Sequence, residues 1–251
     1  MSVADSAKPY RWGASRALII TVAIYIVSQL AAGIALYIYS AANHWTAAQT
    51  TNWLANSVVA QFSLILLVEA ATLGLLYLFL RRYKVNFRDI GLKAPRWRDV
   101  GYALGGFLVY FPLNLVSLFV LRLLVHLNID QKQQLGFKDA GGDMLWLVFI
   151  SLVILPPLIE EILVRGFLYG SLKAHWPKLR AVLVTSLLFA AAHLQIGSGA
   201  SLVWVAAVDT FILSLVLIYL RDKTGGLAAS IMLHMLKNGL AFLALFVLHL
   251  S

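Results

Sequence analysis

The chain has 251 residues, of which 61% are hydrophobic and 12% are charged, and its formal net charge is +9. A soluble domain is about 45–50% apolar and about 25% charged, so this composition excludes a soluble globular protein and predicts a single integral-membrane domain over residues 1–251. The absence of cysteine excludes disulfides, thiolate metal sites and cysteine nucleophiles. The positive charge is expected from basic loops of a membrane protein, so the lipid bilayer is a predicted partner and nucleic acid is not.

The predicted elements are helices that span a membrane. The alternation of apolar and polar residues that is typical of membrane-spanning strands is absent, which argues against a transmembrane β-barrel. An eighth helix would have to come from "HLNIDQKQQLGFKDAGGD", which is more polar than a spanning helix allows. The fold class is therefore an all-α, polytopic membrane helix bundle of about seven transmembrane helices, with eight as the alternative. In chain order, the apolar runs cover residues 17–39, 58–80, 100–124, 144–172, 181–196, 202–220 and 227–250.

Basic residues set the expected orientation of these helices. They collect before the first run, between the second and third, after the fourth and after the sixth. The alternate loops hold only Lys132 and Lys138. Because Lys and Arg favour cytoplasmic loops, the N-terminus is predicted to be cytoplasmic and the C-terminus external. The expected location is a bacterial inner or plasma membrane.

The fourth run contains "LPPLIEEILVRGFL", in which charged residues interrupt an apolar helix. A charge near the bilayer centre costs about 2.5–3.5 kcal/mol even on insertion scales, so it is retained for a reason. Glu161 and Arg165 are four residues apart on one helix face and can form an ion pair. Glu160 points about 100° away and is left for other work. Pro156 and Pro157 should kink the helix and free carbonyl groups that line a cavity.

Two later helices carry polar side chains at a similar depth. The fifth run contains "FAAAH", with Phe189 and His193 on one face, and the seventh contains "HMLKN", with His234 and Asn238 on one face. Counted from the basic loops at a rise of about 1.5 Å per residue, Glu160 and these polar residues all lie about 15–25 Å into the membrane. Three helices thus present a carboxylate, two imidazoles and a carboxamide at one level.

This set of side chains suits hydrolysis. A carboxylate held in an apolar site can act as general base toward water. One histidine can share that water or hold a metal, and a second histidine with an asparagine can stabilise an oxyanion. Two histidines and a glutamate would also make an open catalytic zinc site, formed here by Glu160, His193 and His234.

The three motifs together resemble a known family. "EEILVRG" looks like EExxxR, "FAAAH" like FxxxH and "HMLKN" like HxxxN, in the same order as in the CPBP family of intramembrane proteases. This family is also called Abi and includes the CAAX prenyl endopeptidases of the Ras-converting type. The resemblance covers the second half of the chain, about residues 144–250, whereas the first half matches only as generic membrane helices.

The resemblance implies a role for each motif residue. Glu160 and His193 would activate the attacking water, and His234 with Asn238 would stabilise the oxyanion. Supporting positions would be taken by Glu161, Arg165 and Phe189. The cofactor is either none or a divalent metal such as zinc; the metal-free mechanism is favoured because no third histidine or second free carboxylate completes a conventional site.

Lys237, next to Asn238, is a charged residue of the last helix that none of the three motifs specifies. It lies about 60° from His234 around the helix, so it can face the same cavity. It is predicted to pair with Glu69 or Asp209, or to bind a carboxylate of the substrate.

The sequence therefore predicts an intramembrane endopeptidase that acts on a membrane-associated peptide or protein. CAAX-type processing follows only if the host prenylates proteins, and bacterial members of the family are linked with bacteriocin immunity or maturation. One alternative is a non-catalytic membrane immunity or interaction protein of the same family. A proton-coupled transporter is the other alternative, and the lack of an internal repeat counts against it.

Overall fold

In the computed structural model, the residues described are 10–128, 131, 136–137, 140–194 and 202–249. Over these residues the protein is all-helical, with eight helices, six of which are long and apolar enough to cross a membrane. The prediction of a polytopic helical membrane protein is therefore confirmed.

The first half contains four helices and the second half a long broken helix followed by three more. The first four are α2 (Ala14–Ala42), α3 (Ala47–Asn56), α4 (Val58–Arg82) and α5 (Trp97–Val125). A continuous run then joins α6 (Leu145–Phe149), α7 (Leu155–Glu160) and α8 (Tyr169–His175) through π-helical turns at Ile150–Ile154 and Glu161–Leu168. The last three are α9 (Lys178–Ala192), α10 (Trp204–Thr224) and α11 (Ala228–Phe242), and α11 continues as a π-helical turn over Leu243–Val247.

Two elements differ from the sequence-based expectation. The predicted run 181–196 corresponds to α9, which ends at Ala192 after 15 residues, and the predicted continuation enters residues 195–201, outside those described. The short helix α3 was not predicted. Its N-cap Thr46 accepts a hydrogen bond from Gln49 N at 3.3 Å while Gln49 Oε1 accepts one from Thr46 N at 2.8 Å, which is a capping box. Eight of the 18 residues of the polar segment considered for an eighth helix also lie outside the described residues.

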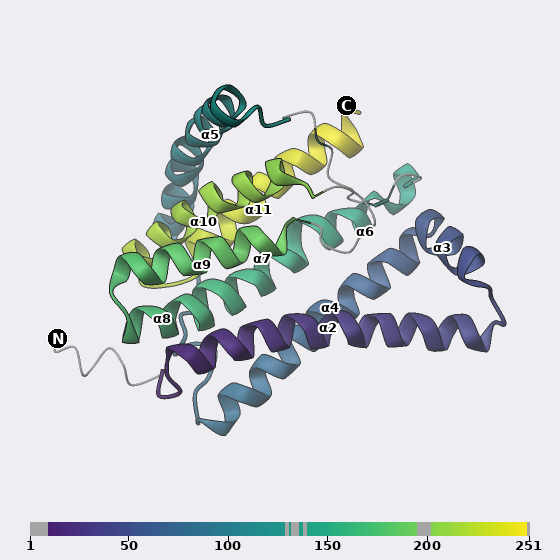
Figure 1. Cartoon of the computed structure of the whole chain (residues 1–251), viewed down its shortest axis with the longest axis horizontal. Helices are drawn as coiled ribbons and strands as arrows, with labels where there is room; N and C mark the ends of the chain where they lie inside the picture. The colour runs from purple at the N-terminus through teal and green to yellow at the C-terminus, as the bar shows by residue number, and fades with distance from the viewer. Residues whose placement is uncertain (1–9, 129–130, 132–135, 138–139, 195–201, 250–251) are drawn as a thin grey trace.

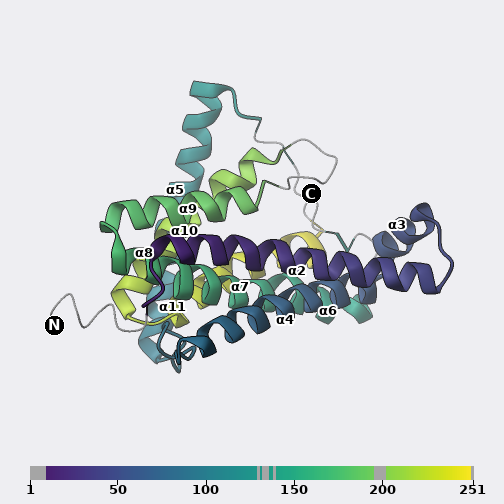
Figure 2. The ribbon, with the colours of Figure 1, turned by 60° about the horizontal axis from the view of Figure 1, so that its bottom comes forward.

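The central run from α6 to α8 lies between two groups of helices (Figure 1). The pair α2 and α4 packs along one side of it, and α9, α10 and α11 lie on the other. Helix α5 packs against α10 and α11, and its far half stands away from the rest of the molecule (Figure 2). The motif-bearing run is therefore the most enclosed element of the bundle.

Burial supports this arrangement. We compare the most apolar 18-residue stretch of each spanning helix. In the central run from Gly142 to His175, 56% of this stretch is buried inside the protein, whereas in α5 only 6% is buried. A helix that is apolar all round but exposed to this extent is covered by lipid, whereas an enclosed one can carry polar groups. The fold thus shields the charges of the central run from lipid.

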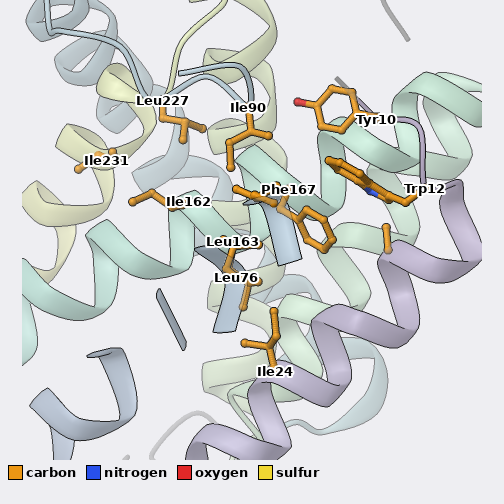
Figure 3. Close-up of a cluster of buried hydrophobic side chains, with 12 residues drawn as sticks. Tyr10, Trp12, Ile24, Leu76, Ile90, Ile162, Leu163, Phe167, Leu227 and Ile231 are labelled. Carbon is orange, nitrogen blue, oxygen red and sulfur yellow. The ribbon is translucent and has the colours of Figure 1, made fainter. Parts of the chain in front are cut away.

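An apolar cluster fixes one end of the central run (Figure 3). Phe167, Ile90 and Leu227 are each 0% exposed, and they come from the run, the α4–α5 loop and the start of α11. The segment before α2 also docks here: Tyr10 OH donates to the Gly166 carbonyl at 3.1 Å, and Trp12 Nε1 donates to Ser171 Oγ at 2.8 Å.

The basic loops meet at this same end of the bundle. Lys93 Nζ donates to the Gly225 carbonyl at 3.1 Å, and Arg221 donates to the Ile90 carbonyl at 3.1 Å. Asp222 pairs with Lys173 at 2.6 Å and with Lys178 at 2.8 Å. The loops that the sequence places on one side of the membrane are therefore neighbours in space, and their cytoplasmic location stays a prediction.

Candidate active site

The second half of the bundle encloses a cavity of about 200 Å³. Glu160, His193, His234 and Asn238 all line it, although they belong to α7, the end of α9 and α11. The other lining residues are Leu152, Pro156, Ala206, Asp209, Thr210, Lys237, Ala241, Phe242 and Phe246. The structure thus brings together the four residues that the sequence singles out for chemistry.

The two prolines shape the wall of this cavity. Leu155 N donates to the Ile150 carbonyl, five residues back, in the π-helical turn before α7. The Leu152 carbonyl lies four residues before Pro156 and five residues before Pro157. A proline has no backbone N–H, so neither residue can donate a hydrogen bond to this carbonyl. Asn238 Nδ2 donates to that carbonyl at 2.9 Å instead. The freed carbonyl therefore fixes the Asn238 side chain at the cavity and leaves its second N–H for another acceptor.

Behind the cavity, Glu161 and Arg165 form a fully buried ion pair. Arg165 Nη1 lies 2.8 Å from Glu161 Oε1, and both side chains are 0% exposed. The Arg165 guanidinium also lies over the Phe189 ring, 4.1 Å from its centroid. A charge removed this completely from solvent is stable only with its partner, so this pair holds the π-helical turn and α9 together.

His234 connects the two adjacent glutamates. Its Nδ1 lies 3.1 Å from Glu161 Oε1, and its Nε2 lies 3.9 Å from Glu160 Oε2. Because an ionised carboxylate only accepts, the Nδ1 atom carries the proton in the bond to Glu161. In neutral His234 the unprotonated Nε2 therefore faces the cavity, and in the cation an N–H faces it. The sequence predicts the partner of Arg165 but gives no signal for this contact between Glu161 and His234.

His193 stands at the C-cap of α9 rather than inside a long helix. Its Nδ1 lies 2.8 Å from the Phe189 carbonyl oxygen, which can only accept, so Nδ1 carries the proton and Nε2 is free toward the cavity. The Phe189 ring contacts both imidazoles edge-on, with centroid distances of 4.7 Å to His193 and 6.0 Å to His234. Phe189 thus packs against both histidines.

Lys237 pairs with Asp209, one of the two carboxylates expected for it. The distance from Lys237 Nζ to Asp209 Oδ2 is 2.8 Å. The other oxygen of Asp209 accepts a hydrogen bond from the Tyr110 hydroxyl of α5. Tyr110 carries no motif, and nothing in the sequence points to it.

The possible zinc ligands do not fit a metal centre. Among the described residues, no three or more His, Cys, Asp or Glu side chains are grouped so that they could hold a metal ion. The chemistry of these residues is therefore considered with water alone.

Comparison with known proteins gives a family match over the segment that contains Glu160, His193, His234 and Asn238. The family described as "Type II CAAX prenyl endopeptidase Rce1-like" matches residues 142–240. An uncharacterized 24.3 kDa protein of Escherichia coli is 30% identical over 130 residues, which are 51% of this chain and 58% of that protein. The chain thus spans little more than half of the length of this relative. No solved structure gives a significant match.

Proposed function

We propose that this protein is an intramembrane endopeptidase, because residues 142–240 match the Rce1-like type II CAAX prenyl endopeptidase family. Its substrate is a membrane-associated protein or peptide, in which it hydrolyses one peptide bond. The observation that carries the proposal is the convergence of Glu160, His193, His234 and Asn238 on one cavity of about 200 Å³. Water activation and oxyanion stabilisation need this combination of groups.

Glu160 is the general base. Its side chain is 30% exposed, and its ion-pair contact with His234 Nε2 is 3.9 Å long, beyond hydrogen-bond length. Within the described part of the chain no closer partner holds its carboxylate oxygens, so they can accept a proton from water. The hydroxide oxygen attacks the substrate carbonyl carbon. Glu160 then passes the proton to the amine nitrogen as the carbon–nitrogen bond breaks.

His193 orients the attacking water. Because its Nδ1 proton is held by the Phe189 carbonyl at 2.8 Å, its Nε2 accepts the second proton of that water as a hydrogen bond. This leaves one O–H of the water directed to Glu160 and an oxygen lone pair directed to the substrate.

His234 and Asn238 stabilise the oxyanion of the tetrahedral intermediate. Asn238 offers the N–H that the Leu152 carbonyl leaves free. His234 can donate from Nε2 only as the imidazolium cation, since its Nδ1 proton is directed at Glu161 Oε1, 3.1 Å away. The Glu161 carboxylate orients the His234 ring through the Nδ1 contact of 3.1 Å, so its supporting role extends from Arg165 to the oxyanion site.

The remaining wall favours an apolar part of the substrate. Leu152, Pro156, Ala241, Phe242 and Phe246 line the cavity beside the polar groups. An apolar side chain next to the scissile bond would fill this side and exclude excess water, which strengthens the electrostatic interactions.

The test is made in the native host. Termini of membrane proteins are compared by mass spectrometry between cells with wild-type protein and cells with Glu160→Ala at equal abundance. Termini that occur only with the wild-type protein are expected, and they identify the substrates. A matched control is Asp222→Asn, which removes an ion-paired carboxylate outside the cavity and should leave the new termini in place.

Identical termini in the two strains, with the wild-type phenotype retained by Glu160→Ala, would overturn the proposal. That result would favour the non-catalytic interaction protein, which needs the folded bundle but not a general base.

A further inference from the structure

The cavity contains a cation that the proposed chemistry does not use. Lys237 is the one Lys or Arg among the described residues that line the cavity, and it shares that lining with Glu160. Its side chain is 25% exposed. An ammonium group on a flexible four-carbon stem can reach several positions in a space of about 200 Å³.

Asp209 holds this ammonium on the α10 side of the cavity. The ion pair between Lys237 Nζ and Asp209 Oδ2 is 2.8 Å long, and the Asp209 side chain is 17% exposed. The Tyr110 hydroxyl donates to the second oxygen of Asp209, and Tyr110 is 3% exposed. Asp209 is therefore fixed from α5 as well as from α11, and its position does not depend on the lysine alone.

Without that partner, the ammonium would have another carboxylate within the same cavity. Opposite charges that approach closely inside a protein attract more strongly than they do in water. The contact of the Glu160 carboxylate with His234 is 3.9 Å long, too long for a hydrogen bond. The carboxylate can therefore still pair with a cation that approaches more closely. An ammonium on Glu160 would occupy the lone pairs that a general base needs.

We propose that Asp209 is a positioning residue that keeps the Lys237 ammonium away from Glu160, so that Glu160 stays free to accept a proton from water. This inference rests on the proposed endopeptidase function. It assigns different consequences to the loss of the two partners of one ion pair. Loss of Asp209 releases a cation onto the general base, whereas loss of Lys237 releases none.

The experiment uses full-length protein in the native host and measures the abundance of the termini that depend on Glu160. Four variants are compared at equal abundance: Asp209→Asn, Lys237→Met, the double variant, and Asp222→Asn as a control on the same helix. Asp209→Asn should lower these termini at least about tenfold, up to the factor of about 10²–10⁴ that a general base contributes. Lys237→Met and the double variant should stay within about threefold of wild type, which corresponds to about 0.7 kcal/mol.

The other outcomes decide against the proposal. Equal losses in both single variants would indicate a structural ion pair, because each variant breaks the same contact. Loss in Lys237→Met with retention in Asp209→Asn would indicate that Lys237 binds a substrate carboxylate. If wild type and Glu160→Ala give the same termini, the proposed function fails first; if they differ but Asp209→Asn cleaves normally, only this inference fails.

Discussion

The adjacent glutamates should separate stability from catalysis when each is changed to glutamine. Glu161 is 0% exposed and 2.8 Å from Arg165, which is also 0% exposed. Glu161→Gln leaves the guanidinium buried without a counter-ion, and breaking such a pair costs about 3–5 kcal/mol. For a protein of this size each kcal/mol lowers the melting temperature by about 2–4 °C, so a decrease of about 6–20 °C is expected.

Glu160→Gln is the matched variant at the neighbouring position. The Glu160 side chain is 30% exposed and its contact with His234 is 3.9 Å long. An isosteric amide there removes no close ion pair and leaves no buried charge unpaired, so the melting temperature should stay within about 2 °C of wild type. Cleavage should be lost, because an amide cannot accept the proton from water.

The melting temperature is measured on the detergent-solubilised proteins, by size-exclusion chromatography after heating. Cleavage is measured as the abundance of new termini in cells. The reasoning would be refuted if both variants destabilised the protein equally, or if Glu161→Gln unfolded at the wild-type temperature.

Three further predictions follow from other contacts. Asn238→Asp should cost about 1–3 kcal/mol of stability and abolish cleavage, because a carboxylate cannot donate to the Leu152 carbonyl; unchanged heat stability would argue against that bond. Gly170→Ala would place a Cβ against the Tyr10 hydroxyl and should cost about 1–3 kcal/mol by overpacking, whereas Gly74→Ala in α4, with nothing within 4 Å, should raise the heat stability slightly in the same assay, because Ala favours a helix over Gly by about 0.5–1 kcal/mol. Incubation of membranes with 1,10-phenanthroline should leave cleavage unchanged, and a loss that zinc restores would contradict the metal-free chemistry.

The sequence predicted the spanning helices well, because crossing a bilayer requires long apolar runs and leaves few alternatives. The runs 58–80 and 100–124 became α4 and α5 with their ends shifted by no more than about three residues, the usual uncertainty of such boundaries. The helix α3 was missed although its signal was present. Thr46 and Gln49 have the spacing of a capping box, but a short helix outside the apolar runs gives no hydropathy signal.

The contacts that give the candidate site its chemistry could not be predicted in the same way. The spacing of Glu161 and Arg165 indicates their ion pair because both lie on one helix. The contact of Glu161 with His234 joins residues 73 positions apart, and it exists only because α11 packs against the central run. Tyr110 meets Asp209 for the same reason, through the packing of α5 on α10.

The sequence by itself determined that this protein is a membrane helix bundle and which polar residues its second half encloses. Those properties follow from local apolarity and from the cost of a charge in lipid, and both act on each segment separately. Only the tertiary structure decided which nitrogen of each histidine is free and which carboxylate holds Lys237. These depend on distances between helices that are far apart in the chain, and such distances are fixed by packing rather than by the composition of any one helix.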